Sequence, residues 1–300
     1  MDYLLLISSV LAGGGRSLFV KGCNKSIENA AQLFFCTFLS SLIAGILIAS
    51  SGTGDLMIPD RRTVLFAVLF ASANIMVDIC NMQAIKTGSY ALSSVFLSSN
   101  FIIPSLSGAF FWNEPISGSQ IIGLVLIVVA LVIVTATKDD LTAGSAKWGL
   151  LAFGSLVFGG CIGLVQKSYC MSARNVNLTL MLVIAFIIKT IFAFICFSVS
   201  SLKQYGKMIF SPKNKHFIMY VMGMSVCMAY VMKANLYLSG ALPSMITFPC
   251  LNGSEILVTT LCSVAIVKEK LSARKILGIA AIICGIVLSG NIVNLLHGLG

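Results

Sequence analysis

The sequence predicts an all-α polytopic membrane protein, with ten transmembrane helices arranged as two inverted five-helix repeats around a central cavity. Its composition, ten apolar runs of helix length and a pair of repeated motifs predict this fold. Of the 300 residues 58% are hydrophobic and only 10% are charged, and the mean hydropathy is +0.99. Soluble domains carry roughly 25% charged residues. Lipid must therefore be the solvent for most of the chain, which excludes a soluble enzyme, a nucleic-acid-binding domain and a disordered tail.

The apolar runs have the length that a membrane-spanning helix requires, which is roughly 20 residues. Short polar segments such as Ser51-Gly52-Thr53-Gly54 separate them, and the loops leave no room for a soluble domain. The runs are continuous rather than alternating, so a closed β-barrel is excluded. The ten predicted spans are residues 3–22, 30–50, 63–86, 90–112, 118–137, 147–168, 178–199, 216–238, 241–266 and 274–295.

Positive charge is distributed unevenly between the two sides of the predicted bundle. The net charge of +10 arises from 20 Lys and Arg against 10 Asp and Glu. Because cytoplasmic loops carry an excess of Lys and Arg, the loops after the odd-numbered spans are predicted to be cytoplasmic and both termini to lie outside. Those loops hold thirteen cations, which are Lys21, Lys25, Lys86, Lys138, Lys147, Lys203, Lys207, Lys213, Lys215, Lys268, Lys270, Arg274 and Lys275. The opposite side holds four, which are Arg61, Arg62, Lys167 and Arg174.

Several motifs recur at nearly constant offsets in the two halves of the chain. Asn113-Glu114-Pro115-Ile116-Ser117 precedes span five and Lys268-Glu269-Lys270-Leu271-Ser272 precedes span ten, with the two Glu residues 155 positions apart. Gly14-Gly15 in span one also echoes Gly159-Gly160 in span six. Five spans per repeat is an odd number, so the second half must be inverted relative to the first, as in many transporters.

These features resemble the drug/metabolite transporter superfamily, and within it the EamA-like family. That family typically carries a Gly-Glu-Arg-Leu-Ser motif before the last span of each repeat, and both motifs here depart from it at the Gly and Arg positions. The resemblance implies two EamA-like repeats, residues 1–140 and 141–300, that form a secondary transporter. It also implies a central cavity lined by spans one, three, four, six, eight and nine, with spans five and ten at the periphery.

Polar residues on one helical face mark two of these spans as candidate cavity walls. Each charge deep in the bilayer costs at least about 2.5 kcal/mol on insertion scales, so it should face a partner or a wet cavity. Asp78 in span three aligns with Lys233 in span eight at the 155-residue offset, which predicts either a separable gating pair or a permanent ion pair. Span three carries Asn74, Asp78 and Asn81 at i, i+4 and i+7, and span eight carries Tyr230, Lys233 and Tyr237 at i, i+3 and i+7.

Three further ionic residues lie within the spans. Arg16 follows three glycines in span one and lies too deep for its side chain to reach the membrane surface. A guanidinium at that depth can bind a carboxylate or phosphate in bidentate fashion. Glu255 lies near the middle of span nine, where it either carries a proton or forms a static pair with Arg16 or Lys233. Lys189, in the middle of span seven, either points inward or reaches a partner on another helix.

The leading functional hypothesis is a secondary active transporter for a small polar metabolite, anionic or zwitterionic, that works by alternating access. Arg16 and Lys233 would bind the anionic group, Asn74, Asn81, Tyr230 and Tyr237 would bind the remainder, and Asp78, Lys233 and Glu255 would gate or couple. The alternative is an exporter of cationic or amphipathic compounds, in which Asp78 and Glu255 recognise the solute or carry a proton. Tyr90 would join Tyr230 and Tyr237 in holding such a cation.

Other classes of protein are disfavoured by the sequence. An enzyme is not expected, because the only histidines, His216 and His297, lie at helix ends without a metal-binding motif. The ten cysteines are scattered without a CxxC pair, and no Walker A sequence exists, so we expect no cofactor and no direct use of ATP. A passive scaffold has no need of buried charge.

The expected partners are a small-molecule substrate and the lipid bilayer, with no nucleic acid. A stripe of small residues in span ten, Ala281, Gly285 and Ser289, suggests a possible homodimer surface. We expect an integral, multi-pass protein, most simply of a bacterial plasma membrane.

Overall fold

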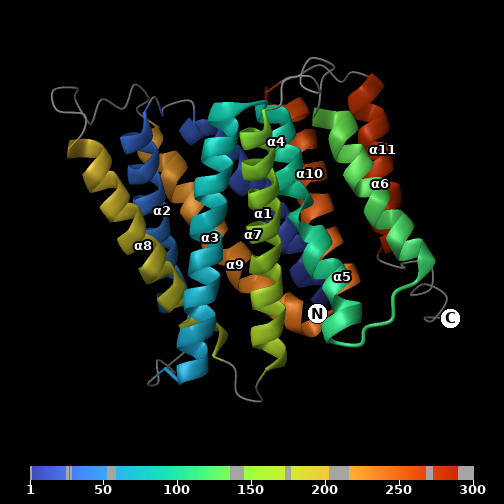
Figure 1. Ribbon diagram of the computed structural model, residues 1–300, viewed down its shortest axis with the longest axis horizontal. Coiled ribbons are helices and arrows are strands. Elements are labelled where there is room, and N and C mark those ends of the chain that lie inside the picture. The colour runs from blue at the N-terminus through green and yellow to red at the C-terminus, as the bar shows by residue number, and fades with distance from the viewer. Residues whose placement is uncertain are drawn as a thin grey trace.

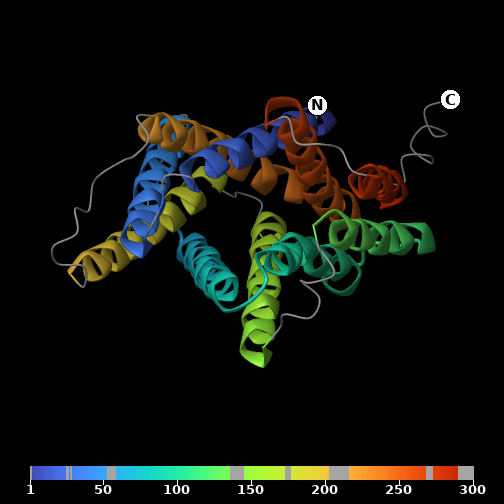
Figure 2. The same cartoon turned by 90° about the horizontal axis from the view of Figure 1, so that it is seen from above.

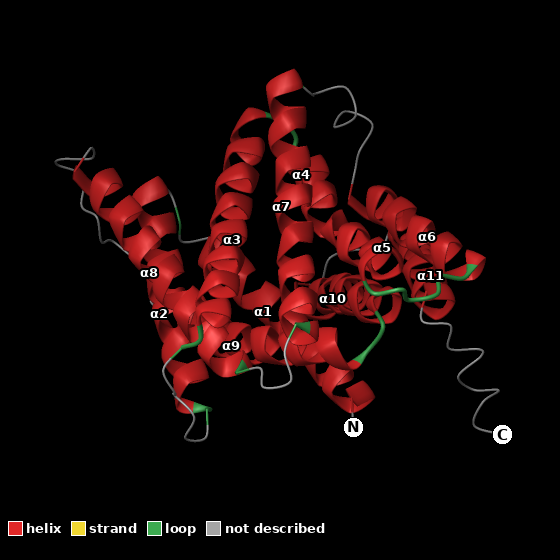
Figure 3. Ribbon diagram, turned by 60° about the horizontal axis from the view of Figure 1, so that its bottom comes forward, coloured by secondary structure: helices red, strands yellow, loops and turns green. Residues whose placement is uncertain are grey.

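The computed structural model is built from helices throughout the part of the chain that it describes (Figures 1 and 3). It describes residues 2–24, 27, 29–52, 59–135, 145–172, 177–202, 216–267 and 273–289. The helices are α1 (Asp2–Asn24), α2 (Ala30–Ser50), α3 (Arg61–Thr87), α4 (Tyr90–Ser98), the 3₁₀ helix η1 (Ser99–Phe101), α5 (Ile102–Phe111), α6 (Gly118–Thr135), α7 (Ala146–Met171), α8 (Leu178–Leu202), α9 (Phe217–Ala241), α10 (Ser244–Val267) and α11 (Ala273–Ser289).

Length and apolar composition make this a multi-pass membrane protein. Seven helical stretches of the described residues can cross a bilayer, namely α1, α2, α3, the run from Leu92 to Phe111, α7, α8 and α9. Two shorter apolar helices, Gly118–Ile133 and Ile276–Ser289, coincide with predicted spans five and ten. Ten crossings therefore remain a prediction. Large apolar side chains such as Leu4, Phe110 and Leu150 are more than 70% exposed, which only a lipid environment accommodates without cost.

The predicted fourth span is one helix interrupted at its centre. α4 passes through η1 directly into α5, where Pro104 is the third residue. Proline lacks an N–H and crowds the carbonyl of the residue four positions earlier, here Asn100, so the α-helical ladder tightens into a 3₁₀ turn at that point. A break of this kind allows the two parts of the span to change their relative angle.

The helices pack mainly in pairs taken from opposite halves of the chain. α2 packs against α8 and α6 against α11 at the two ends of the molecule, while α1 packs with α9 and α3 with α7 between them (Figure 2). α1 and α9 are antiparallel, because Gly22 faces Tyr220 at one end and the Tyr237 hydroxyl reaches Asp2 at the other. The interface between the halves therefore runs through the whole molecule.

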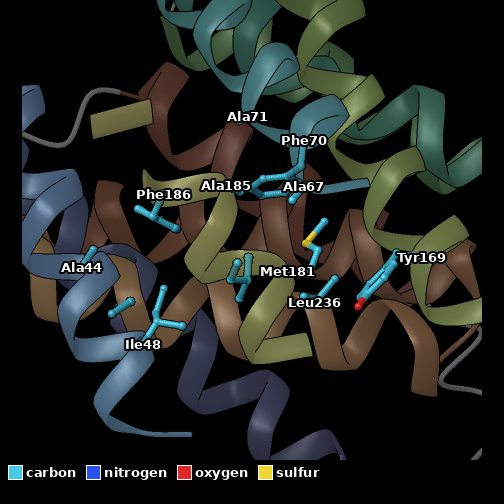
Figure 4. Close-up of a cluster of buried hydrophobic side chains, with 12 residues drawn as sticks. Ala44, Ile48, Ala67, Phe70, Ala71, Tyr169, Met181, Ala185, Phe186 and Leu236 are labelled. Atoms are coloured by element: carbon cyan, nitrogen blue, oxygen red, sulfur yellow. The ribbon is translucent and has the colours of Figure 1, made fainter. Parts of the chain in front are cut away.

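The largest cluster of buried side chains joins α2, α3 and α8 with the ends of α7 and α9 (Figure 4). Alanines Ala44, Ala67 and Ala71 are fully or almost fully buried in it beside larger residues such as Ile48 and Met181. Small side chains let neighbouring helices approach closely, and close van der Waals packing is what holds helices together where lipid is the competing solvent.

Glycines at corresponding positions allow equivalent close approaches in the two halves. A Cβ at Gly13 would lie 3.1 Å from Glu255 Cδ, and one at Gly159 would lie 2.8 Å from Asn100 Cβ. Gly14 faces Val258 and Gly160 faces Ile103 in the same way. The facing residues correspond at an offset of 155, which relates Asn100 to Glu255 and Ile103 to Val258. The glycine pairs correspond at an offset of 146, which relates Gly13-Gly14 to Gly159-Gly160. The glycine correspondence is thus one residue earlier than the Gly14-Gly15 alignment predicted from sequence.

The small-residue stripe of predicted span ten packs within the chain. Gly285 lies against Ile127 and the backbone of Gly123 on α6, and Ser289 is fully buried. Gly285 of this stripe therefore packs against α6 of the same chain, and the homodimer stays a prediction.

Candidate functional site

The structure shows three ion pairs among its described residues, and each joins the first half of the chain to the second. They are Arg16–Glu255, Lys167–Glu114 and Lys189–Asp78. A buried ion pair gains little net stability over an apolar contact, because the desolvation of both charges offsets their attraction. The exposure of these charged side chains ranges from 3% at Lys167 to 53% at Asp78, and three ion pairs across one interface favour a role beyond stability.

The Arg16–Glu255 pair lies where α1 meets α10. Arg16 Nη2 is 3.2 Å from Glu255 Oε1, and the Ser17 hydroxyl donates to the same oxygen at 3.2 Å. The two charged side chains are 29% and 24% exposed. Gly13 carries no side chain that would push the carboxylate away, so Glu255 lies directly against α1. Of the two alternatives for Glu255, pairing with Arg16 is the one this structure contains.

Asp78 and Lys233 have different partners and do not form the predicted pair. Asp78 Oδ2 accepts from Lys189 Nζ of α8 at 2.9 Å. Lys233 Nζ donates to the carbonyl and hydroxyl oxygens of Ser51, each at 3.0 Å, and so binds the carbonyl end of α2. Lys189, which the sequence left unplaced, is thus the helix partner of Asp78.

Helix direction explains why the predicted pair is absent. α3 begins beside the start of α8, since Thr63 and the backbone of Asn177 both bond to the Tyr169 hydroxyl. α9 instead ends on that side, where Lys233 reaches Ser51. Asp78 lies in the second half of α3 and Lys233 in the second half of α9. Because α3 and α9 run in opposite directions, the two side chains lie on opposite sides of the middle of the bundle.

The predicted asparagines of α3 make few polar contacts. Asn74 donates to the carbonyl of Phe70 in its own helix at 2.9 Å. The Asn81 side-chain oxygen is buried and has no hydrogen-bond partner. Buried polar atoms are nearly always satisfied in folded proteins, so an orphaned oxygen of this kind is an available acceptor.

The predicted tyrosines of α9 face α1. The Tyr230 hydroxyl lies 2.6 Å from the Ser8 hydroxyl, and the Tyr237 hydroxyl donates to Asp2 Oδ1 at 3.5 Å. Of the eight predicted site residues, the structure joins Arg16 to Glu255. Five others bond elsewhere, namely Asn74, Asp78, Tyr230, Lys233 and Tyr237, and the Asn81 oxygen is unpartnered. The side chain of Tyr90 lies outside the described residues.

The most deeply buried ion pair was missed by the sequence reasoning. Lys167, assigned above to the outer loop region, lies inside α7 with only 3% of its side chain exposed, and its Nζ is 2.8 Å from Glu114 Oε1. The loop assignment is wrong, because α7 continues to Met171 and Lys167 faces the bundle. The signal was present in the sequence, since Glu114 is the acidic residue of the repeated motif; its counterpart Glu269 lies outside the described residues.

Fold and buried charges together define the class of the protein, a helical multi-pass membrane protein with a polar interface between two halves. The sequence model of the EamA-like transporter family matches residues 1–136. The match spans less than half of the 300 residues, so this part of the chain is similar to the EamA-like transporters.

A solved structure shares the fold of nearly the whole chain. Twenty-nine chains of known structure match. One of them, titled only "Crystal structure of protein", has a TM-score of 0.74 and 12% sequence identity, and the match covers 96% of this chain and 97% of that one. No curated protein matches. At this identity the likeness shows the fold alone.

Proposed function

We propose that the protein is a secondary active transporter for a small anionic or zwitterionic metabolite, and that it works by alternating access between two inverted halves. The proposal includes the ten predicted spans, repeats at 1–140 and 141–300, a central cavity between them and a location in a bacterial plasma membrane. The partly exposed Arg16–Glu255 pair between the halves is the observation that carries it.

The packing of the helices supports two inverted repeats. In an inverted repeat, each span is equivalent to the span five positions later. The α1–α9 contact is then equivalent to the α7–α3 contact, and the α2–α9 contact to the α8–α3 contact. All four contacts occur in the structure. The same exchange maps α2–α8 and α6–α11 onto themselves. A two-fold axis in the membrane plane produces this pattern, and in such folds the solute binds near that axis.

Exposure along α3 supports an accessible space in the interior. Ala67, Ala71, Asn74 and Asp78 share one face of α3 at helical spacing. The two alanines are at most 1% exposed, whereas the Asp78 side chain is 53% exposed. A face that is sealed at one end and open at the other is expected of a bundle whose cavity opens to one side.

Arg16 is the residue best suited to bind an anion. Its guanidinium donates to Glu255 Oε1 at 3.2 Å and can offer further N–H groups in a planar fork to a carboxylate or phosphate. A monoanion would displace Glu255 from Arg16, whereas a zwitterion would use both, with its cationic group on Glu255. Lys233 adds a second cation, one whose bonds go to Ser51 and to no carboxylate among the described residues.

One observation favours the alternative, an exporter of cationic or amphipathic compounds. In the Asp78–Lys189 pair the carboxylate is 53% exposed and the ammonium only 11%, so the accessible partner is the acid. A cationic solute would approach Asp78 without first displacing a buried lysine.

A ligand-stabilisation screen separates these two readings. Purified protein would be heated with amino acids, sugar phosphates, nucleotides or quaternary amines, and its unfolding temperature measured. We expect anionic or zwitterionic ligands to stabilise the wild type, and the Arg16→Gln variant to lose this response. Arg62→Gln, which removes an exposed arginine at the start of α3, is the matched control and should keep it. Stabilisation by amines that survives Arg16→Gln and disappears in Glu255→Gln or Asp78→Asn would overturn the proposal in favour of the alternative.

A further inference from the structure

We propose that Glu114 and Lys167 form a latch that closes the side of the transporter where α10 begins, and that this latch opens when Glu114 takes up a proton. The inference rests on the proposed alternating-access function. It assigns the coupling role to a carboxylate outside the predicted site rather than to Asp78 or Glu255.

Every polar atom of the ion pair is engaged across the two halves. Lys167 Nζ donates to Glu114 Oε1 at 2.8 Å and to the carbonyl of Leu242 at 2.9 Å. The other carboxylate oxygen, Glu114 Oε2, accepts from the backbone N–H of Ser244 at 2.7 Å. The pair therefore ties the connection after α5 to the end of α7 and to the junction between α9 and α10.

The local sequence after α5 directs Glu114 into the bundle. Asn113 adopts a left-handed conformation with φ of 51°, and the N–H of Glu114 returns to the carbonyl of Gly108 at 3.0 Å. This bond folds the chain back onto the last turn of α5, and asparagine tolerates the left-handed position. Gly108 leaves the space that the carboxylate occupies, since a Cβ there would meet Glu114 Oε2 and Ser244 Cβ.

The carboxylate accepts hydrogen bonds from a lysine ammonium and from a helix N-terminus. Ser244 is the first residue of α10, so Glu114 lies at the positive end of that helix dipole. The charged group that faces it is Lys167 from α7; α5 contributes Gly108, and the α9–α10 junction contributes Leu242 and Ser244. Trp112 lies beside Lys167, with its ring centroid 5.9 Å from Nζ, and Tyr169 and Cys170 are the titratable groups that follow along α7.

Separation of the halves on this side must break the pair. Breaking it costs the attraction between the two charges, and a proton on Glu114 removes that attraction, so a neutral Glu114 favours opening. The Ser244 hydroxyl is fully buried at this position and has no partner, which leaves an acceptor available for the proton of a neutral Glu114. By the distribution of loop charges this side is the outer one, so the proton would come from outside.

The two tryptophans of the chain provide a reporter for each side. Trp112 lies at the latch, whereas Trp148 lies at the start of α7, against Gly88 at the end of α3, on the opposite side. Quenching by acrylamide, a neutral water-soluble reagent, would be measured in lipid nanodiscs without solute. Trp148→Phe leaves Trp112 as the single reporter, and Trp112→Phe leaves Trp148.

We expect Glu114→Gln to raise the quenching constant of Trp112 by about twofold, as a shift from a mostly closed to a half-open population would do. The same variant should leave Trp148 unchanged or better protected. Acidification should raise Trp112 quenching in the wild type and in Glu114→Asp, which keeps a carboxylate, and should have no effect in Glu114→Gln.

Two results would overturn the latch. One is a folded Glu114→Gln variant whose Trp112 quenching equals that of the wild type at every pH. The other is an equal rise at Trp112 and Trp148, which would mean that the pair only stabilises packing. Because no solute is present, these results are independent of the screen above. If solutes stabilise the protein but Glu114→Gln does not expose Trp112, the latch is refuted and the transport proposal stands. If Glu114→Gln exposes Trp112 but no solute stabilises the protein, the transport proposal is refuted and the opening itself stands.

Discussion

The Glu114–Lys167 and Arg16–Glu255 pairs have the same chemistry and opposite surroundings. Both join the two halves, yet Lys167 is 3% exposed with its partner held by a helix N-terminus, while Arg16 and Glu255 are 29% and 24% exposed. The first pair has bonds to backbone groups of other elements, and the second accepts a bond from the Ser17 side chain. Burial and bonds to the backbone suit an ion pair that holds one side of the bundle closed. Exposure suits an ion pair whose members can exchange each other for a solute.

The largest expected effect comes from removing one partner of the buried pair. Lys167→Met leaves the Glu114 carboxylate buried without its cation, which should lower the free energy of unfolding by about 3–5 kcal/mol. Denaturant unfolding in detergent measures this loss. The double variant Lys167→Met with Glu114→Gln should recover a large part of it, because no uncompensated charge remains. Equal losses in the single and double variants would show that the two residues act independently.

Gly108→Ala tests the space in which the carboxylate lies. The added methyl group would meet Glu114 Oε2 and lie 3.0 Å from Ser244 Cβ, so we expect a loss of roughly 1–3 kcal/mol from overpacking. Gly149→Ala in α7 is the matched control, since nothing lies within 4 Å of the new Cβ there. That control should be neutral or stabilising, and similar losses in both variants would argue against a specific clash at the latch.

Glu255→Gln should separate function from stability at the exposed pair. Exposed ion pairs contribute about 0–1 kcal/mol, so the unfolding free energy should change little. Ligand-dependent stabilisation should change strongly, because Arg16 loses its competing carboxylate. A loss of stability as large as that of Lys167→Met would remove the distinction drawn between the two pairs.

The smallest effect is expected at Asn113. Its φ of 51° is one that glycine adopts freely, so Asn113→Gly should alter the unfolding free energy by only a few tenths of a kcal/mol. Asn113→Val, with a β-branched side chain, should cost about 1–2 kcal/mol and also raise Trp112 quenching. Thermal unfolding of both variants checks the pair of expectations.

Helix positions could be read from the sequence because the apolar runs are long and the polar breaks are short. The described helices fall on the predicted spans, and the 3₁₀ break around Ser99–Phe101 interrupts the fourth span beside Pro104. Side-chain partners were harder to predict. Lys189 reaches Asp78 because α8 packs beside α3, and a periodicity argument along one helix carries no information about its neighbours.

The sequence by itself determined that lipid is the solvent, where the helices run, and which residues carry charge that must be compensated within the bundle. Those conclusions follow from composition and local hydrophobicity, which are properties of short segments. Only the tertiary structure decided that Glu255 meets Arg16, that Lys189 rather than Lys233 meets Asp78, and that Lys167 is buried against Glu114. The physical reason is that ion pairing depends on which helices are neighbours and on their relative direction, and these are set by packing between segments far apart in the chain.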